Sequence, residues 1–420
     1  MKDIHTPDSD KRILRTLITS SALSKVADWQ LGIVIPLTVL AESDSVALSL
    51  AVFALRGVSY VVSPFVGAII DRFDKRTVLV LALLQQAACL ALLPVSLSSP
   101  PAVALIVLLS GMGSVACIIT GHFVTIPRLI SPPARSVAVG KLNSAMEFSK
   151  VVGILLGGAG FTAFGPAIAS LCIAALYVLA GIVALALPRM PSTQTEMNLR
   201  HDLAVGFRWV GRREILWLVV TMSITNVAIG QLEPALVTEF SSGGINPTVI
   251  SVLMALGLLT GAVASRFASS FLPSLSWERR ILASQIMAFT GLVCIAVPVL
   301  PVRIMGFMVE CFAIAVTNVA SIVYRQETIP PDLAGRVNAT IRMFITGSVP
   351  LSGFLYAWAS RFDGYRSWLP SLVLWVISIG IWAVHTRYGA RVTAMPPAGG
   401  VAPSAEPEPQ PRQELRDGDR

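Results

Sequence analysis

Long apolar stretches alternate with short polar loops along almost the whole chain. Each stretch is close to the ~20 residues that a helix needs to cross the hydrocarbon core of a bilayer. We count twelve, at residues 16–40, 46–70, 77–97, 102–123, 138–162, 166–187, 214–238, 248–270, 280–300, 303–324, 338–359 and 367–386. Lipid offers no hydrogen-bond partner to the backbone, so all twelve are expected to be helices. The pattern therefore predicts an all-α membrane protein with twelve transmembrane helices.

The longest polar loop divides these stretches into two sets of six. The pattern predicts an arm at residues 1–15, a bundle at 16–187, a linker at 188–213, a second bundle at 214–388 and a disordered tail at 389–420. Within the linker, residues 201–210 are amphipathic and predict a short helix along the membrane surface. Weak internal repeats relate residues 67–73 to 261–267 and residues 131–135 to 329–333. The two bundles are therefore expected to be pseudo-symmetric.

Composition and charge support a membrane protein and exclude several other classes. Only 13% of the 420 residues are charged, against about a quarter in soluble proteins. The net charge of +8 comes mainly from even-numbered loops, which predicts that these loops and both termini are cytoplasmic and that nucleic acid is not a partner. The five cysteines lie in apolar stretches, without metal-site or disulfide spacing. No nucleotide-binding loop or catalytic constellation appears, so we expect neither an enzyme nor a cofactor or metal.

Ionisable residues inside the apolar stretches are the candidate functional groups, because burying them in a membrane is costly. Lys25 and Asp28 share one helical face with Ser21 and Ser24. The fifth stretch repeats this arrangement with Glu147 and Lys150, and the second adds Arg56. Glu310, in the tenth stretch, has no cation at helical spacing. Proton-coupling candidates are Asp28, Glu310 and Glu147, in that order; the alternative is that the Lys25–Asp28 and Glu147–Lys150 pairs are static.

The loop between the second and third stretches carries a specific motif. Gly67, Asp71, Arg72, Lys75 and Arg76 match the G-x-x-x-D-R-x-x-R-R signature between helices two and three of the major facilitator superfamily, although an ordinary basic loop is the alternative. The resemblance implies a monomeric transporter of two six-helix bundles, with the motif as a cytoplasmic gate. Residues 153–158 also resemble the glycine-rich antiporter motif of superfamily exporters, with Ile154 in place of its proline.

Residues 54–76 and 324–339 are similar to one branch of this superfamily, which contains siderophore exporters and macrolide efflux pumps. The resemblance implies a bacterial inner-membrane antiporter that exports a siderophore or drug-like molecule in exchange for protons. Because siderophores are often anionic, Lys25, Arg56 and Lys150 are candidates for substrate contact, together with Asn226 and Asn318. Two alternatives remain open: an importer of a small metabolite, and a non-transporting sensor or assembly protein of the same fold.

The gate motif generates the first testable prediction. Asp71 is expected to lie against the start of the eleventh helix, whose N-terminus carries partial positive charge, and to stabilise the state closed to the cytoplasm. Asp71→Asn is therefore expected to reduce transport while leaving the amount of folded protein unchanged. Transport equal to wild type at matched expression would remove Asp71 from the gate.

Overall fold

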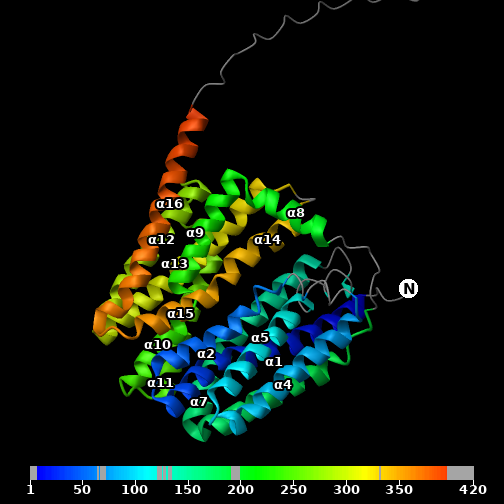
Figure 1. The fold of residues 1–420 in the computed structure, drawn as a ribbon. Helices are drawn as coiled ribbons and strands as arrows, with labels where there is room; N and C mark the ends of the chain where they lie inside the picture. Colours follow the sequence, from blue (N-terminus) through cyan, green and yellow to red (C-terminus); the bar gives the residue numbers. More distant parts are fainter. Residues whose placement is uncertain are drawn as a thin grey trace, which may run out of the picture.

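The computed structural model describes residues 7–63, 72–120, 135–190, 199–330 and 333–394, with isolated residues at 66, 125, 129 and 130. Within these residues, every regular element is a helix, as Figure 1 shows. The prediction of an all-α chain is confirmed. Residues 64–65 and 67–71, in and before the gate motif, are not among the described residues. At the ends of several described ranges, only the backbone is described.

The N-terminal half consists of α1 (Pro7–Ser43), α2 (Val46–Val58), α4 (Lys75–Ser96), α5 (Pro100–Ile118) and α7 (Arg135–Ala184). The fifth and sixth predicted helices are joined in α7, which bends at Gly165, where φ is 75° and ψ is 176°. A positive φ of this kind favours glycine, and Pro166 follows it. The boundary between these two spans therefore falls where it was predicted.

The C-terminal half begins with α8 (Leu199–Val210), which confirms the amphipathic helix predicted in the linker. It continues with α9 (Arg213–Ile229), α10 (Leu232–Ser242), α11 (Pro247–Phe267), η3 (Ala268–Ser270), α12 (Trp277–Ala296), α13 (Leu300–Thr328), α14 (Ala334–Gly347), α15 (Val349–Ala359), η4 (Gly364–Trp368) and α16 (Leu369–Ala394). Since α16 reaches Ala394, the first residues of the predicted tail are helical, and residues 395–420 lie outside the described residues.

Three predicted helices are interrupted, each near a proline in the sequence. The helix predicted over 46–70 ends at Val58 and is followed by turns, shortly before Pro64. The seventh is divided into α9 and α10 before Pro234, and the eleventh into α14 and α15 before Pro350. Proline has no amide hydrogen for the preceding turn, so the helical ladder is broken there.

By length and hydropathy, nine helical segments of the described residues are candidates to span a membrane. The interruptions reconcile this number with the twelve predicted spans. The long α7 contains two spans, α2 is a shorter apolar helix, and the eleventh span is divided between α14 and α15. The chain therefore has the apolar helices of a multi-pass membrane protein.

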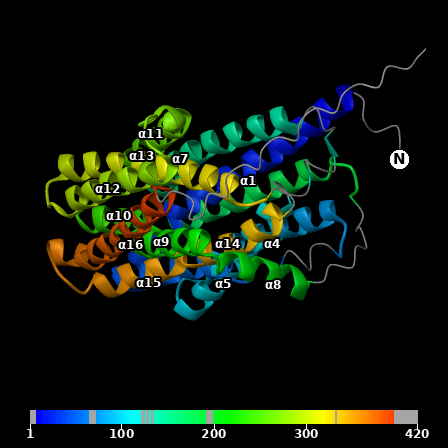
Figure 2. The same cartoon turned by 90° about the horizontal axis from the view of Figure 1, so that it is seen from above.

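The two halves pack separately and meet along a limited set of helices. In the N-terminal half α7 packs on α1 and α4, and in the C-terminal half α13 packs on α11 and α12. Contacts between the halves join α7 to α11, α2 to α15, and α10 to both α1 and α2. Figure 2 shows the same helices from above. The third, ninth and twelfth spans, α4, α12 and α16, pack within their own halves.

Close contacts between the halves cluster toward one end of the molecule. Thr162 receives a hydrogen bond from Thr248 at 3.0 Å and donates one to the Asn246 side chain at 3.2 Å. One apolar cluster joins Ile33, Leu37 and Leu50 to α10 and α11 residues such as Leu236 and Ile250. In Figure 1 the halves converge toward this end, near α10 and α11, and diverge toward the end that carries the N-terminus.

The glycines of residues 153–158 allow this close packing. A Cβ added at Gly153 or Gly157 would meet the α1 backbone, and one added at Gly158 would collide with the Pro247 carbonyl and the Ser251 side chain of the other half. Small residues let helix backbones approach in this way. The packing role of the motif is therefore confirmed.

Gly158 provides a test of the contact between the halves. Gly158→Ala is expected to lower stability by about 1–3 kcal/mol through overpacking, because the methyl group has no space against α11. Gly160→Ala is the matched control, since a Cβ there meets nothing within 4 Å. The measurement is the thermal unfolding midpoint in detergent. Equal midpoints for the two variants would show that the halves do not meet at Gly158.

Candidate functional site

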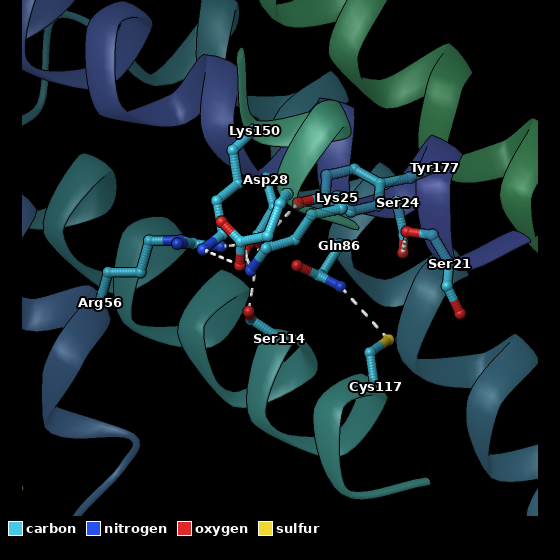
Figure 3. Close-up of polar contacts among 11 residues, drawn as sticks. Ser21, Ser24, Lys25, Asp28, Arg56, Gln86, Ser114, Cys117, Lys150 and Tyr177 are labelled. Carbon is cyan, nitrogen blue, oxygen red and sulfur yellow. Dashed lines mark hydrogen bonds and ion pairs between the residues drawn. The ribbon is translucent and has the colours of Figure 1, made fainter. Parts of the chain in front are cut away.

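Asp28, on α1, lies at the centre of a buried polar cluster. Its carboxylate accepts hydrogen bonds from Arg56 of α2, from Ser114 of α5 at 3.1 Å and from Tyr177 of α7 at 3.1 Å. The Lys25 ammonium, one turn away, lies 3.6 Å from the other carboxylate oxygen. Figure 3 shows these side chains converging on Asp28. The structure thus joins three of the predicted site residues to two that the sequence did not indicate.

The charges of Asp28 and Arg56 are buried and paired. The side chains of Asp28 and Arg56 are only 14% and 15% exposed. Desolvation penalises both charges, but direct pairing and hydrogen bonds from neutral hydroxyls offset that cost.

A small cavity adjoins this cluster. It has a volume of about 30 Å³ and is lined by polar groups that include Ser20, Ser24, Gln86 and Ser114. A polar cavity of this size accommodates water but not a metabolite. Gln86 also donates to the Cys117 thiol at 3.6 Å. Asp28 is thus next to space in which water can take part in its hydrogen bonding.

The second predicted pair lies nearby and is more open. Lys150 contacts Glu147 at 2.6 Å, and the Glu147 side chain is 52% exposed. The ammonium groups of Lys150 and Lys25 lie 5.5 and 5.9 Å from the centre of the Trp29 ring, within the range of cation–π attraction. Trp29 therefore lies between the two lysines. The sequence did not indicate this role, because Lys150 is on a different helix from Trp29 and Lys25.

Glu310 has a different environment in the C-terminal half. It is buried, with 5% exposure, and its electrostatic neighbours are Glu233 and Cys311. Glu233, at the start of α10, is in turn within electrostatic range of Lys150. Glu233 of the C-terminal half is therefore within electrostatic range of a cation on α7 of the N-terminal half.

The predicted asparagines do not lie together. Asn226 donates to the Ile345 carbonyl at 2.5 Å, and the backbone amide of Gln231 donates to Ser352 at 3.0 Å. These bonds join the interruptions of the seventh and eleventh spans. Asn318, by contrast, is exposed, so the structure does not bring it into the same group.

The gate motif is described only in part. Gly67 and Asp71 lie outside the described residues, and Arg72 is exposed. Lys75 is fully buried, and its ammonium donates to the Phe73 carbonyl at 3.3 Å. Arg76 donates to the carbonyls of Leu185 and Leu187, both at 3.2 Å. The basic end of the motif is therefore attached to the end of the sixth span.

Asp74 reinforces this attachment and was not a predicted site residue. It accepts hydrogen bonds from the Thr77 amide at 2.9 Å and the Met190 amide at 2.7 Å. Burial acts to raise the pKa of Asp74, but these hydrogen bonds outweigh it and hold that pKa below its usual value. Asp74 is thus ionised at neutral pH, and its stabilising contribution is lost only in acid, as pH falls through the lowered pKa.

Within the described residues, no group of three or more His, Cys, Asp or Glu side chains is arranged to hold a metal ion. The unpredicted members of the Asp28 cluster had one weak signal in the sequence. Ser114 and Tyr177 are polar residues within apolar stretches. Nothing in their spacing connects them to Asp28, because they reach it from different helices.

Comparison with known proteins gives a family and a fold. A sequence profile described as Major Facilitator Superfamily matches residues 17–353. A search of curated proteins finds no match. The structure is similar to that of the nucleoside transporter NupG, with 13% identity, 91% of this chain and 100% of that chain covered, and a TM-score of 0.72.

Two further solved structures are similar at low identity. A bacterial homologue of the iron transporter ferroportin, in an inward-facing state, is 16% identical over 89% of this chain and 98% of that chain, with a TM-score of 0.70. A bacterial homologue of the human lysosomal transporter Spinster, inward-facing and unoccupied, is 12% identical over 94% and 100%, also with a TM-score of 0.70. At these identities the likeness shows the fold alone.

The buried pair yields a stability prediction. Arg56→Gln leaves Asp28 buried without its main partner and is expected to lower the free energy of unfolding by about 3–5 kcal/mol. The double variant Asp28→Asn/Arg56→Gln is expected to recover part of this loss, because the uncompensated charge is gone. The measurement is chemical unfolding in detergent.

Lys150→Gln is the control for the Arg56 variant, because its partner Glu147 is half exposed and such pairs contribute about 0–1 kcal/mol. If Arg56→Gln and Lys150→Gln lower the free energy of unfolding equally, the buried Asp28–Arg56 pair stabilises the fold no more than a solvated pair.

Proposed function

The chain belongs to the major facilitator superfamily and has the fold of a secondary transporter, and we propose that it exports an anionic small molecule in exchange for protons. Its substrate class is that of siderophores or drug-like molecules, as the resemblance of its loops to that branch implies. It acts in a bacterial inner membrane with both termini in the cytoplasm. The observation that carries the proposal is the buried charge cluster of Asp28, Arg56 and Lys25 inside the N-terminal half.

The arrangement of the halves supports transport by alternating access. The close contacts described above lie at the end remote from the N-terminus. With the termini in the cytoplasm, this end is the outer one, so the halves are in contact on the outer side. Opening to the outside requires Thr162 to separate from Asn246 and Thr248, and Gly158 from Pro247. Such a separation also exposes the apolar cluster that joins Ile33, Leu37 and Leu50 to α10 and α11.

The lysines on either side of Trp29 support an anionic substrate. Lys25 and Lys150 each lie within 6 Å of the ring centre, so a planar anion has both charge and an aromatic surface to bind. Lys150 is the more accessible of the two, with its side chain 24% exposed against 17% for Lys25. Arg56 is committed to Asp28 and contacts substrate only after that pair opens.

Coupling is assigned to Asp28, with Glu310 second and Glu147 third. In an exchanger the proton and the substrate occupy the site in turn. With the site open to the outside and empty of substrate, Arg56 moves away and Asp28 takes up a proton through the adjacent water-sized cavity. With the site open to the cytoplasm, Arg56 returns to Asp28 and expels the proton, and the substrate then binds beside Lys25 and Lys150 for export. Glu310 is the alternative, since it is buried beside Glu233 and its electrostatic neighbours among the described residues include no cation. Glu147 is the least suitable proton-coupling residue of the three, because it is paired with Lys150 and half exposed.

The coupling step can be tested in proteoliposomes. Asp28→Asn mimics the protonated carboxylate, so it is expected to abolish uphill transport driven by a pH gradient while downhill exchange of substrate persists. Candidate substrates come from mass spectrometry of the medium of cells with and without the gene. Substrate flux is measured with and without an imposed gradient.

Glu310→Gln is the matched variant for this assay. If Asp28→Asn retains gradient-driven transport and Glu310→Gln loses it, the proton site lies in the C-terminal half. Accumulation of substrate inside wild-type cells, rather than loss to the medium, would establish import and overturn export.

A further inference from the structure

A basic groove lies at the N-terminal end of α1, apart from the cluster around Asp28. It is lined by Lys11, Arg12, Arg15, Thr16 and Thr19 of α1 and by Val183 of α7, and its volume is about 410 Å³. Lys11, Arg12 and Arg15 are exposed. The groove therefore presents three cations and two hydroxyls, a set suited to a phosphate group.

The position of the groove indicates a membrane boundary. Val183 is near the end of the apolar segment Val137–Ala184, and α1 continues from Thr19 into its own apolar segment. Phospholipid phosphates lie at this depth in either leaflet, so the argument does not depend on which side faces the cytoplasm. A nucleic acid or a soluble acidic peptide has no reason to be held at this boundary.

An apolar surface runs from the groove along α7. Leu171, Val178, Leu179, Ile182 and Leu185 are each 38–58% exposed. Leu171, Val178, Ile182 and Leu185 recur at intervals of seven, four and three residues, so they form one helical stripe, with Leu179 beside it. The stripe provides a surface for an acyl chain whose headgroup occupies the groove. A free phosphate would use the cations alone, whereas a lipid uses both features.

We propose that the groove of Lys11, Arg12 and Arg15 binds the headgroup of an anionic phospholipid, with an acyl chain along the exposed stripe of α7. A lipid held here bridges the first and sixth spans. Arg76 attaches the loop between the second and third spans to the same end of the sixth span, through the carbonyls of Leu185 and Leu187. The lipid is thus placed to stabilise the end of the N-terminal half that carries the gate motif.

Native mass spectrometry of the full chain in detergent tests this proposal. The probes are phosphatidylglycerol and phosphatidylcholine with identical acyl chains. Wild type is expected to bind phosphatidylglycerol at least tenfold more tightly. Each cation near an anionic headgroup accounts for roughly a fivefold change in affinity. Arg15→Gln is therefore expected to weaken phosphatidylglycerol binding about fivefold, and Lys11→Gln/Arg12→Gln/Arg15→Gln more than tenfold.

The control removes three exposed cations elsewhere: Arg208→Gln/Arg266→Gln/Arg279→Gln, which changes the net charge equally and is expected to bind as wild type. Unfolding midpoints without added lipid show whether the variants are folded, and Arg15→Gln alone decides the outcome if the triple variant is not. An equal loss in the control, equal binding of phosphatidylcholine by wild type, or displacement of the lipid by millimolar inorganic phosphate would each overturn the proposal.

Discussion

The ion pair between Asp28 and Arg56 is the interaction on which the N-terminal half depends. Two charges in a low-dielectric interior are tolerated only when they are paired and their remaining hydrogen-bonding capacity is used. Lys25, Ser114 and Tyr177 supply the additional contacts, and with Arg56 they come from four different helices. The positions of α1, α2, α5 and α7 are therefore linked to the charge of one carboxylate. A change in that charge alters a hydrogen bond or ion pair made by each of these four helices.

The contact between the two halves involves interrupted helices instead of buried ion pairs. The breaks before Pro234 and Pro350 divide the seventh and eleventh spans, and the side chain of Pro350 packs close to Gly57 of the opposite half. Small residues and shortened helices bring the halves together with few polar bonds. Strong contacts lie within each half, and weaker ones lie between them. Movement of one half against the other is the change that this distribution makes least costly.

The two halves also differ in charge. The N-terminal half buries cations and carboxylates together, whereas Glu310 and Glu233 of the C-terminal half lie near one another. Lys150 is the cation that acts on Glu233 from the opposite half. Attraction between the halves at their contact therefore adds to the packing of small residues.

The sequence alone predicted the all-α fold and the local pairing of charges within a helix. Hydrophobic stretches and charged loops are local, and helical spacing correctly paired Lys25 with Asp28 and Glu147 with Lys150. The contacts of Asp28 with Arg56, Ser114 and Tyr177 were decided only by the tertiary structure. Their residues are separated by 28 to 149 positions along the chain. No periodicity within one helix indicates which faces of other helices will meet it, because packing between helices sets that geometry.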